Sequence, residues 1–354
     1  VSIDAVKKAM GLEIAEGVTC LLFVELDGSR CEVDRSRERI DHVSRREGGL
    51  GTEWSDDPAR RQILWSARHG LVTALSRINP GARQMPITED FGVPMSSIPQ
   101  TLREIREIGE RHGVRIATFG HIGDGNLHAV LLVDPRDPDG WAVTRRIAED
   151  FIALTLARNG TLSAEHGVGL AKAPYIHREL EGALEVMGSI KRALDPGNIL
   201  NPGKLGFEDS IGDIYDRFAF DGLSDSCQGT RSFGPEVDDE ILACNQCGLC
   251  TLACPTYGLT QIETMNARGR NNLAFNLLTG RIEPSIDMAH RLFRCTLCDA
   301  CRTTCPAGVH TSLIGAAART RLHEAGFTPG PLAGALASIG RNGNPFLQNQ
   351  GTRV

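Results

Sequence analysis

The chain has 354 residues, which is enough for two domains of about 150 residues each. Hydrophobic residues make up 41% of it and charged residues 23%, as in a folded globular protein and unlike a disordered or collagen-like chain. The formal net charge of -6 gives no reason to expect nucleic-acid binding, and no apolar run is long enough to predict a transmembrane segment.

The part of the chain before the cysteine-rich region alternates between strand and helix patterns. Residues 17–26 form an apolar run typical of a buried strand, and residues 96–113 carry a helical period that ends at a glycine. Residues 115–120 and 127–134 are predicted strands joined by a Gly-rich turn, and an amphipathic helix is predicted over 139–160. The pattern predicts an α+β fold.

The composition changes near residue 207. Ten acidic residues lie between Glu208 and Glu240, against two arginines, and this stretch is typical of a solvated linker. Beyond it the pattern is mainly helical, interrupted by two cysteine runs. We expect four segments along the chain: a domain over 1–206, an acidic linker over 207–237, a second domain over 238–330, and a tail over 331–354 that leads to a missing C-terminal region.

Eleven cysteines indicate the chemistry of the second half. Eight of them form two runs of identical spacing, Cys-x2-Cys-x2-Cys-x3-Cys-Pro, and the others are Cys20, Cys31 and Cys227. The N-terminus has no apolar leader, so an odd, clustered set favours metal ligation in a reducing compartment over disulfides. We expect a cytoplasmic protein, either free there or peripheral at the inner face of the membrane.

The spacing of the two runs is typical of two-cluster ferredoxins, in which the fourth cysteine, before Pro, ligates the other cluster. The crossed assignment gives one [4Fe–4S] cluster the ligands Cys244, Cys247, Cys250 and Cys305, and the second cluster Cys254, Cys295, Cys298 and Cys301. The alternatives are zinc ribbons, which use separate Cys-x2-Cys pairs, and free structural thiols. A lone linker thiol such as Cys227 is expected to be an ordinary cysteine.

Residues 238–326, with these two runs, resemble the iron–sulfur module of the glycolate oxidase iron–sulfur subunit and of heterodisulfide reductase-like proteins. The resemblance implies a mainly helical ferredoxin-like domain with two [4Fe–4S] clusters that carries electrons to a downstream acceptor. These relatives usually continue into a further cysteine-rich domain, which this sequence does not contain.

Histidines gather at two glycine-rich segments of the first half. His121 and His128 lie on either side of the turn between the two predicted strands, so both imidazoles can face one centre. Downstream, Glu165 and His166 add a carboxylate and a third imidazole in a loop of small residues. Such a set is suited either to a divalent metal that polarises a hydroxyl or carbonyl, or to ordinary hydrogen-bonded core histidines.

Three segments in this order, GHIGDGNLH, SAEHGVGLAKAPYI and IKRALDPGNILNPGK, resemble the C-terminal (cap) domain of FAD-linked oxidases over residues 1–205. That family includes D-lactate dehydrogenases, glycolate oxidase flavoprotein subunits and D-2-hydroxyglutarate dehydrogenases. The resemblance implies an antiparallel sheet with helices, a divalent metal (Zn or Mn) on His121, His128 and Glu165, and His166 as the base that takes the hydroxyl proton.

The same resemblance implies how substrate and flavin are bound. Trp65 to Arg68 match a segment whose arginine clamps the substrate carboxylate, although a solvated helical arginine is the alternative, and Asn126 matches a contact to flavin or substrate. Thr88 and Val130 stand where the 2-hydroxyglutarate branch has Lys and Asn. We therefore expect a small 2-hydroxy acid rather than a dicarboxylate as substrate.

The FAD-binding domain of that family has no counterpart in the sequence. HIGDGN is not a Gly-x-Gly-x-x-Gly loop between a strand and a helix, so it is not interpreted as a dinucleotide site. We expect a fragment of a flavin-linked 2-hydroxy acid dehydrogenase whose FAD is bound by another domain or subunit. The alternative is an electron-transfer module in which the cap is scaffolding for a separate flavoprotein.

Overall fold

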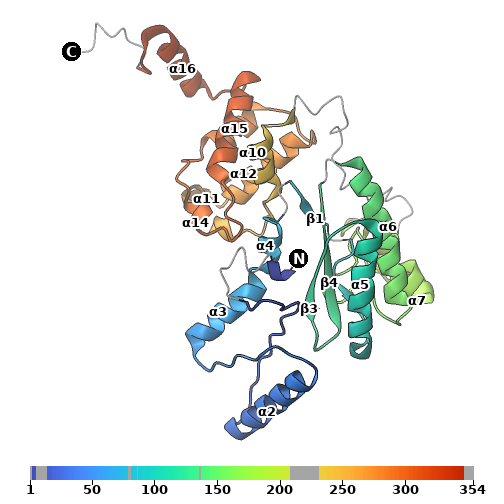
Figure 1. Ribbon diagram of the computed structural model, residues 1–354. Helices are drawn as coiled ribbons and strands as arrows, with labels where there is room; N and C mark the ends of the chain where they lie inside the picture. Colours follow the sequence, from blue (N-terminus) through green and yellow to red (C-terminus); the bar gives the residue numbers. More distant parts are fainter. Residues whose placement is uncertain are drawn as a thin grey trace. The chain divides into compact units, whose positions relative to one another are not determined.

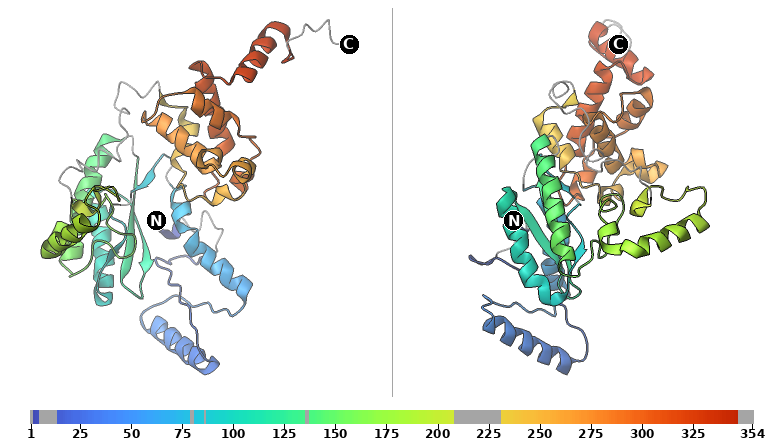
Figure 2. Two further views of the ribbon diagram at one scale, coloured as in Figure 1. Left: turned by 180° about the vertical axis from the view of Figure 1, so that it is seen from behind. Right: turned by 90° about the vertical axis from the view of Figure 1, so that its right-hand side faces the viewer.

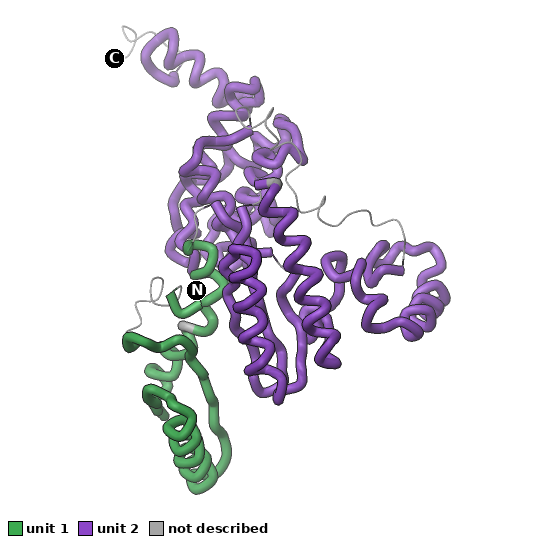
Figure 3. The backbone as a smooth tube through the Cα atoms, turned by 45° about the vertical axis from the view of Figure 1, so that its right-hand side comes forward, with its two compact units in different colours: residues 1–78 green, residues 79–354 purple. Residues whose placement is uncertain are grey.

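A computed structural model describes residues 2–4, 14–78, 81–85, 87–134, 137–207 and 231–346. The chain divides into two compact units, residues 1–78 and 79–354 (Figure 3). Most of the expected acidic linker, with Cys227, and the end of the expected tail lie outside the described residues. The four segment boundaries expected from composition therefore stay predictions.

The first unit contains the helices α2 (Arg30–Arg46), α3 (Pro58–His69) and α4 (Leu71–Leu75). The Ser29 side chain accepts a hydrogen bond from the N–H of Glu32, whose carboxylate accepts one from the N–H of Ser29, so a capping box starts α2. Asp57 caps α3 by accepting from the N–H of Arg60.

The strand predicted over 17–26 is wrong. This stretch is not assigned as a strand, and Leu22 is 67% exposed. An extended segment becomes a strand only when its N–H and C=O groups pair with a neighbour, and no described residue of the first unit supplies that pairing. Its Phe23 ring lies 5.9 Å from that of Trp65 on α3, and Cys20 is exposed.

An antiparallel sheet in the second unit confirms the predicted hairpin. The central strand β4 (Asn126–Val133) pairs along one edge with β3 (Ile116–His121). Its other edge pairs with β1 (Arg83–Met85) at one end and β2 (Phe91–Gly92) at the other. Seven of the eight β4 positions are buried, as expected for the central strand of a covered sheet.

Helices α5 (Ile98–His112) and α6 (Pro138–Leu156) pack against each other and against β3 and β4 (Figure 1). Gly113, with φ of 66°, ends α5 in the left-handed conformation that glycine adopts without a Cβ penalty. The apolar sides of the helices and sheet share one core, which includes Ile105, Ile108, Leu127, Leu131, Ile147 and Phe151. Full burial of each such side chain stabilises the fold by about 1.5–3 kcal/mol.

Past the sheet, α7 (His177–Leu194) and η2 (Lys204–Gly206) complete the cap residues. The helical prediction for the cysteine-rich part is confirmed (Figures 1 and 2). Its elements are α10 (Pro235–Leu242), η3 (Leu249–Thr251), α11 (Pro255–Thr260), η4 (Glu263–Met265), α12 (Ala267–Leu278), α13 (Ile286–Phe293), α14 (Ala300–Thr303), α15 (Thr311–Glu324) and α16 (Gly330–Asn342). A second core formed around α12 includes Ile241, Leu242, Leu278, Leu292, Ile314 and Leu322.

Candidate functional site

The β3–β4 hairpin positions two of the predicted histidines. His121 ends β3 opposite Asn126, and His128 lies on β4 opposite Phe119. Gly125 makes the turn possible, because its φ is 84° and a Cβ there would lie 2.1 Å from the carbonyl oxygen of Val93. The sheet buries His128 to 3% exposure, whereas the side chain of His121 stays 48% exposed.

Asp90 holds the loop that carries the other two predicted residues. Its Oδ1 accepts from the N–H of Glu165 at 2.9 Å, and its Oδ2 accepts from the N–H of His166 at 2.9 Å and from the Ser163 hydroxyl at 2.9 Å. Burial alone would raise the pKa of Asp90, but these donors and the charge of Lys172 hold it below its ordinary value. Both oxygens of Asp90 are occupied in this way, so Asp90 anchors the loop rather than offering itself as a ligand.

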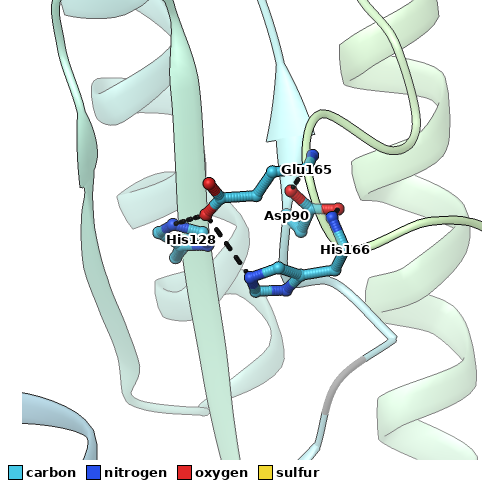
Figure 4. A group of neighbouring side chains, drawn as sticks. All are labelled: Asp90, His128, Glu165 and His166. Carbon is cyan, nitrogen blue, oxygen red and sulfur yellow. Dashed lines mark hydrogen bonds and ion pairs between the residues drawn. The ribbon is translucent and has the colours of Figure 1, made fainter.

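Three imidazoles converge on one carboxylate oxygen. Oε1 of Glu165 lies 3.2 Å from Nε2 of His128, 3.4 Å from Nε2 of His166 and 3.7 Å from Nε2 of His121 (Figure 4 shows the first two contacts). Ligands of a tetrahedral zinc with bonds of about 2.0–2.1 Å are separated by about 3.3 Å. The donor atoms that all lie within 4.8 Å of one another belong to His128, Glu165, His166 and Asp90, so the predicted ligand His121 lies outside this set.

Behind two of the rings lies Glu89, to which the sequence assigned no role. Its Oε2 accepts a hydrogen bond from Nδ1 of His166 at 2.8 Å, and its Oε1 lies 2.8 Å from Nδ1 of His128, at an angle outside hydrogen-bond geometry. Burial alone would raise the pKa of Glu89, but its contacts with the two imidazoles lower it, so it stays ionised. A carboxylate against Nδ1 favours the tautomer whose Nε2 lone pair points to the centre.

The site opens to solvent on one side. The side chains of Glu165 and His166 are 45% and 50% exposed, in contrast to the buried His128. The His128 ring stacks on that of His166 with centroids 5.3 Å apart and meets that of His121 edge-on at 5.6 Å. A small molecule can therefore approach the exposed members while the sheet holds the buried one.

Two further predicted residues lie in different places. The side-chain amide of Asn126 is buried, and its Oδ1 has no hydrogen-bond partner within the described part of the chain. An orphaned buried acceptor is what a ligand-contacting amide would leave in a chain without its ligand. Arg68 lies on α3 in the first unit, where it stays a prediction as a carboxylate clamp.

Sequence reasoning missed Glu89 and Asp90 as parts of the site. The signal was two adjacent acidic residues directly before β2, a strand that pairs with the histidine-bearing end of β4. Asp90 also has a φ of 64°, which is uncommon for a residue other than glycine. Such backbone geometry is not visible in a sequence.

One cavity is lined by Cys254 together with Cys295, Cys298 and Cys301. Four thiolates on one zinc would have sulfurs separated by about 3.8 Å. No three cysteines among the described residues have all their sulfurs within 4.8 Å of one another, which is wider than the spacing of a zinc site.

Cys305 lies near enough to two cysteines of the first run to affect their pKa. Burial raises the pKa of Cys244 and raises that of Cys250 to about 11, and the charge of Cys305 adds to both shifts. In Cys254 the balance is opposite: burial would raise its pKa, but donors from Thr256 and Tyr257 outweigh burial. The charge of Cys301 also acts on Cys250, so these interactions do not separate the two ligand sets and the crossed assignment stays a prediction.

The two cysteine loops repeat one backbone conformation. Gln246 and Gly248 in the first loop have φ of 56° and 87°, and Leu297 and Asp299 have φ of 55° and 58° at the same positions of the second. Residues of alternating handedness turn successive N–H groups toward a common concavity, which suits anionic iron–sulfur groups. The N–H of Val309 also lies 3.5 Å from the sulfur of Cys305.

Comparison with protein-family models agrees with the family resemblance expected for each half of the chain. Residues 1–205 match the C-terminal domain of FAD linked oxidases, and residues 240–309 match the 4Fe-4S dicluster domain. The chain belongs to the FAD-linked oxidases. Within the described residues, no helix of this FAD-linked oxidase has the length and apolar character needed to cross a membrane.

The curated relatives that the chain matches include dehydrogenases and oxidase subunits named for different 2-hydroxy acids. A probable mitochondrial D-lactate dehydrogenase of Danio rerio is 34% identical over 206 residues, covering 58% of this chain and 41% of the relative. The glycolate oxidase subunit GlcD of Bacillus subtilis is 33% identical, covering 54% and 40%. A D-2-hydroxyglutarate dehydrogenase of Escherichia coli is 27% identical over 252 residues, covering 66% and 24%. The chain thus spans about two fifths or less of the length of these relatives.

Proposed function

We propose that this chain supplies the substrate-activating cap and the electron exit of a flavin-linked 2-hydroxy acid dehydrogenase. The observation that carries the proposal is the convergence of three imidazole Nε2 atoms on Oε1 of Glu165 at the open side of a rigid hairpin. Glu165, His121 and His128 would hold a divalent metal such as Zn or Mn, which polarises a substrate hydroxyl when it is bound.

His166 is suited to the role of base. Glu89 accepts its Nδ1 proton, which leaves the Nε2 lone pair facing the centre to take the hydroxyl proton from C2. Arg68 would hold the substrate carboxylate through two parallel hydrogen bonds. FAD, bound by another domain or subunit with a contact from Asn126, supplies the two-electron acceptor for C2.

Electrons leave one at a time, and the cysteine-rich half supports that step. Cys244, Cys247, Cys250 and Cys305 would hold one [4Fe–4S] cluster, and Cys254, Cys295, Cys298 and Cys301 the other. The competing proposal is an electron-transfer module whose cap serves as scaffolding. Three imidazole nitrogens within 3.7 Å of one carboxylate oxygen favour the enzyme, because scaffolding needs no such convergence on a partly exposed carboxylate.

The substrate is proposed to be a small 2-hydroxy acid such as D-lactate or glycolate. Thr88 is buried and donates to the carbonyl of Ala129 at 2.7 Å, and Val130 is buried and apolar, so neither offers a cation or amide for a second carboxylate. D-2-hydroxyglutarate is the second candidate, because the 252-residue alignment with that relative exceeds residues 1–205 and therefore extends beyond the cap.

Steady-state oxidation of D-lactate, glycolate and D-2-hydroxyglutarate by the complete protein, with metal analysis, tests this proposal. His166→Ala should lower kcat by roughly 10²–10⁴-fold and keep the metal. His121→Ala should lose the metal together with activity. If both variants keep wild-type turnover, the cap is scaffolding and the electron-carrier proposal replaces this one.

A further inference from the structure

Two consecutive side chains of α12, Arg270 and Asn271, are buried among the cysteine ligands. Arg270 is 2% exposed, and its Nη1 lies 3.9 Å from the sulfur of Cys254. Asn271 is 3% exposed, and its Nδ2 lies 3.6 Å from the sulfur of Cys244. On the crossed assignment these two sulfurs belong to different clusters, so one helix turn contacts both.

Arg270 is a fixed, buried cation. Its Nη2 donates to Oγ1 of Thr256 at 3.0 Å and its Nε donates to the carbonyl of Arg291 at 3.2 Å. No carboxylate in the described part of the chain forms an ion pair with it, whereas Arg268 on the same helix pairs with Glu263 at 2.6 Å. A buried cation is costly without a counter-charge, and here the thiolate of Cys254 is the anionic group within reach.

Asn271 contacts the sulfur of Cys244 through a neutral side chain, whereas Arg270 contacts that of Cys254 through a charged one. Its Nδ2 also donates to Oγ1 of Thr311 at 3.2 Å, so the amide is held in place while it faces the sulfur of Cys244. Adding an electron to a cluster adds negative charge, which a nearby buried cation stabilises strongly and a neutral donor stabilises less. The two side chains therefore act on different clusters with different strength.

We propose that α12 tunes the two clusters separately: Arg270 raises the reduction potential of the cluster ligated by Cys254, and Asn271 makes a smaller adjustment to the cluster ligated by Cys244. This inference rests on the proposed function, since it requires two clusters with crossed ligands. Both side chains are positioning residues for electron flow and take no part in chemistry at the substrate.

The test is a redox titration of the anaerobically prepared protein, followed by EPR, after iron and sulfide analysis. About eight of each per chain establishes the two clusters, and a lower content contradicts the proposed function rather than this inference. In Arg270→Gln, one of the two reduction steps should move to lower potential. At the wild-type midpoint of that step, the ratio of reduced to oxidised cluster should fall about tenfold. This corresponds to a decrease of ~59 mV in the midpoint potential of a one-electron step.

Three further variants separate charge from structure. Arg270→Lys keeps a cation and should keep the step near its wild-type position. Asn271→Leu should move the other step, by less than tenfold. Arg341→Gln removes an exposed arginine of α16 and should move neither step. If Arg270→Gln fails to assemble its cluster, Asn271→Leu still tests the inference. An unchanged reduction potential in Asn271→Leu overturns the inference, and so does a shift of both reduction steps together in any variant.

Discussion

Replacing Glu89 by Gln is the sharpest probe of the histidine site, because it removes one charge and keeps the side-chain shape. The Glu89 carboxylate faces Nδ1 of His128 and Nδ1 of His166, each at 2.8 Å. A glutamine offers one carbonyl and one NH₂ group. Its NH₂ group would favour the tautomer of one ring with the proton on Nε2, which turns a lone pair away from the centre.

The expected loss follows from these contacts. A hydrogen bond to a charged group contributes about 1.5–3 kcal/mol, and Glu89→Gln removes the charge from the hydrogen bond with His166 and from the close contact with His128. Loss of an outer partner of a ligating histidine typically lowers metal affinity about 10–100-fold, which corresponds to about 1.4–2.7 kcal/mol. We expect the loss of metal affinity in Glu89→Gln to lie in this range. Glu89→Asp has a side chain one methylene shorter, and its metal affinity should lie between those of Glu89→Gln and the wild type.

Calorimetric titration with Mn²⁺ measures this effect, since Mn²⁺ prefers oxygen and nitrogen ligands and avoids the cysteines. The matched control is Glu107→Gln, an equal loss of charge at an exposed position of α5. Thermal unfolding of each variant shows whether the fold is retained. If folded Glu89→Gln binds Mn²⁺ within twofold of the wild type, the carboxylate does not orient the imidazoles and this reasoning is refuted.

Two other predictions concern the clusters and the loop anchor. Cys254→Ser should alter the same EPR signal as Cys295→Ser and a different one from Cys250→Ser; a signal shared with Cys250→Ser would show that the ligands are not crossed. Asp90→Asn should lower the Tm at pH 7. Because the pKa of Asp90 is held below its ordinary 3.8, its contribution is present above about that pH and is lost as the pH falls through the lower value. An equal Tm difference at pH 7 and under strong acid would contradict the assigned role.

The sequence alone determined the features that depend on short-range spacing. The cysteines of each run lie within one loop, so their number and spacing already indicated cluster binding and the exchange of Cys254 and Cys305. The hairpin was equally predictable, because two β-rich runs flank a turn with Gly125. The family comparisons agree with an iron–sulfur domain in the cysteine-rich half.

Tertiary structure decided which side chains meet across long separations. Glu89 reaches His166 and Asp90 reaches Glu165 only because β2 pairs with β4 and the backbone of Gly92 pairs with Thr161. The strand predicted over 17–26 failed for the related reason that an apolar run describes one segment and not its partner. Periodicity is a local property of a chain, whereas pairing, burial and the convergence of charges arise from contacts between distant residues.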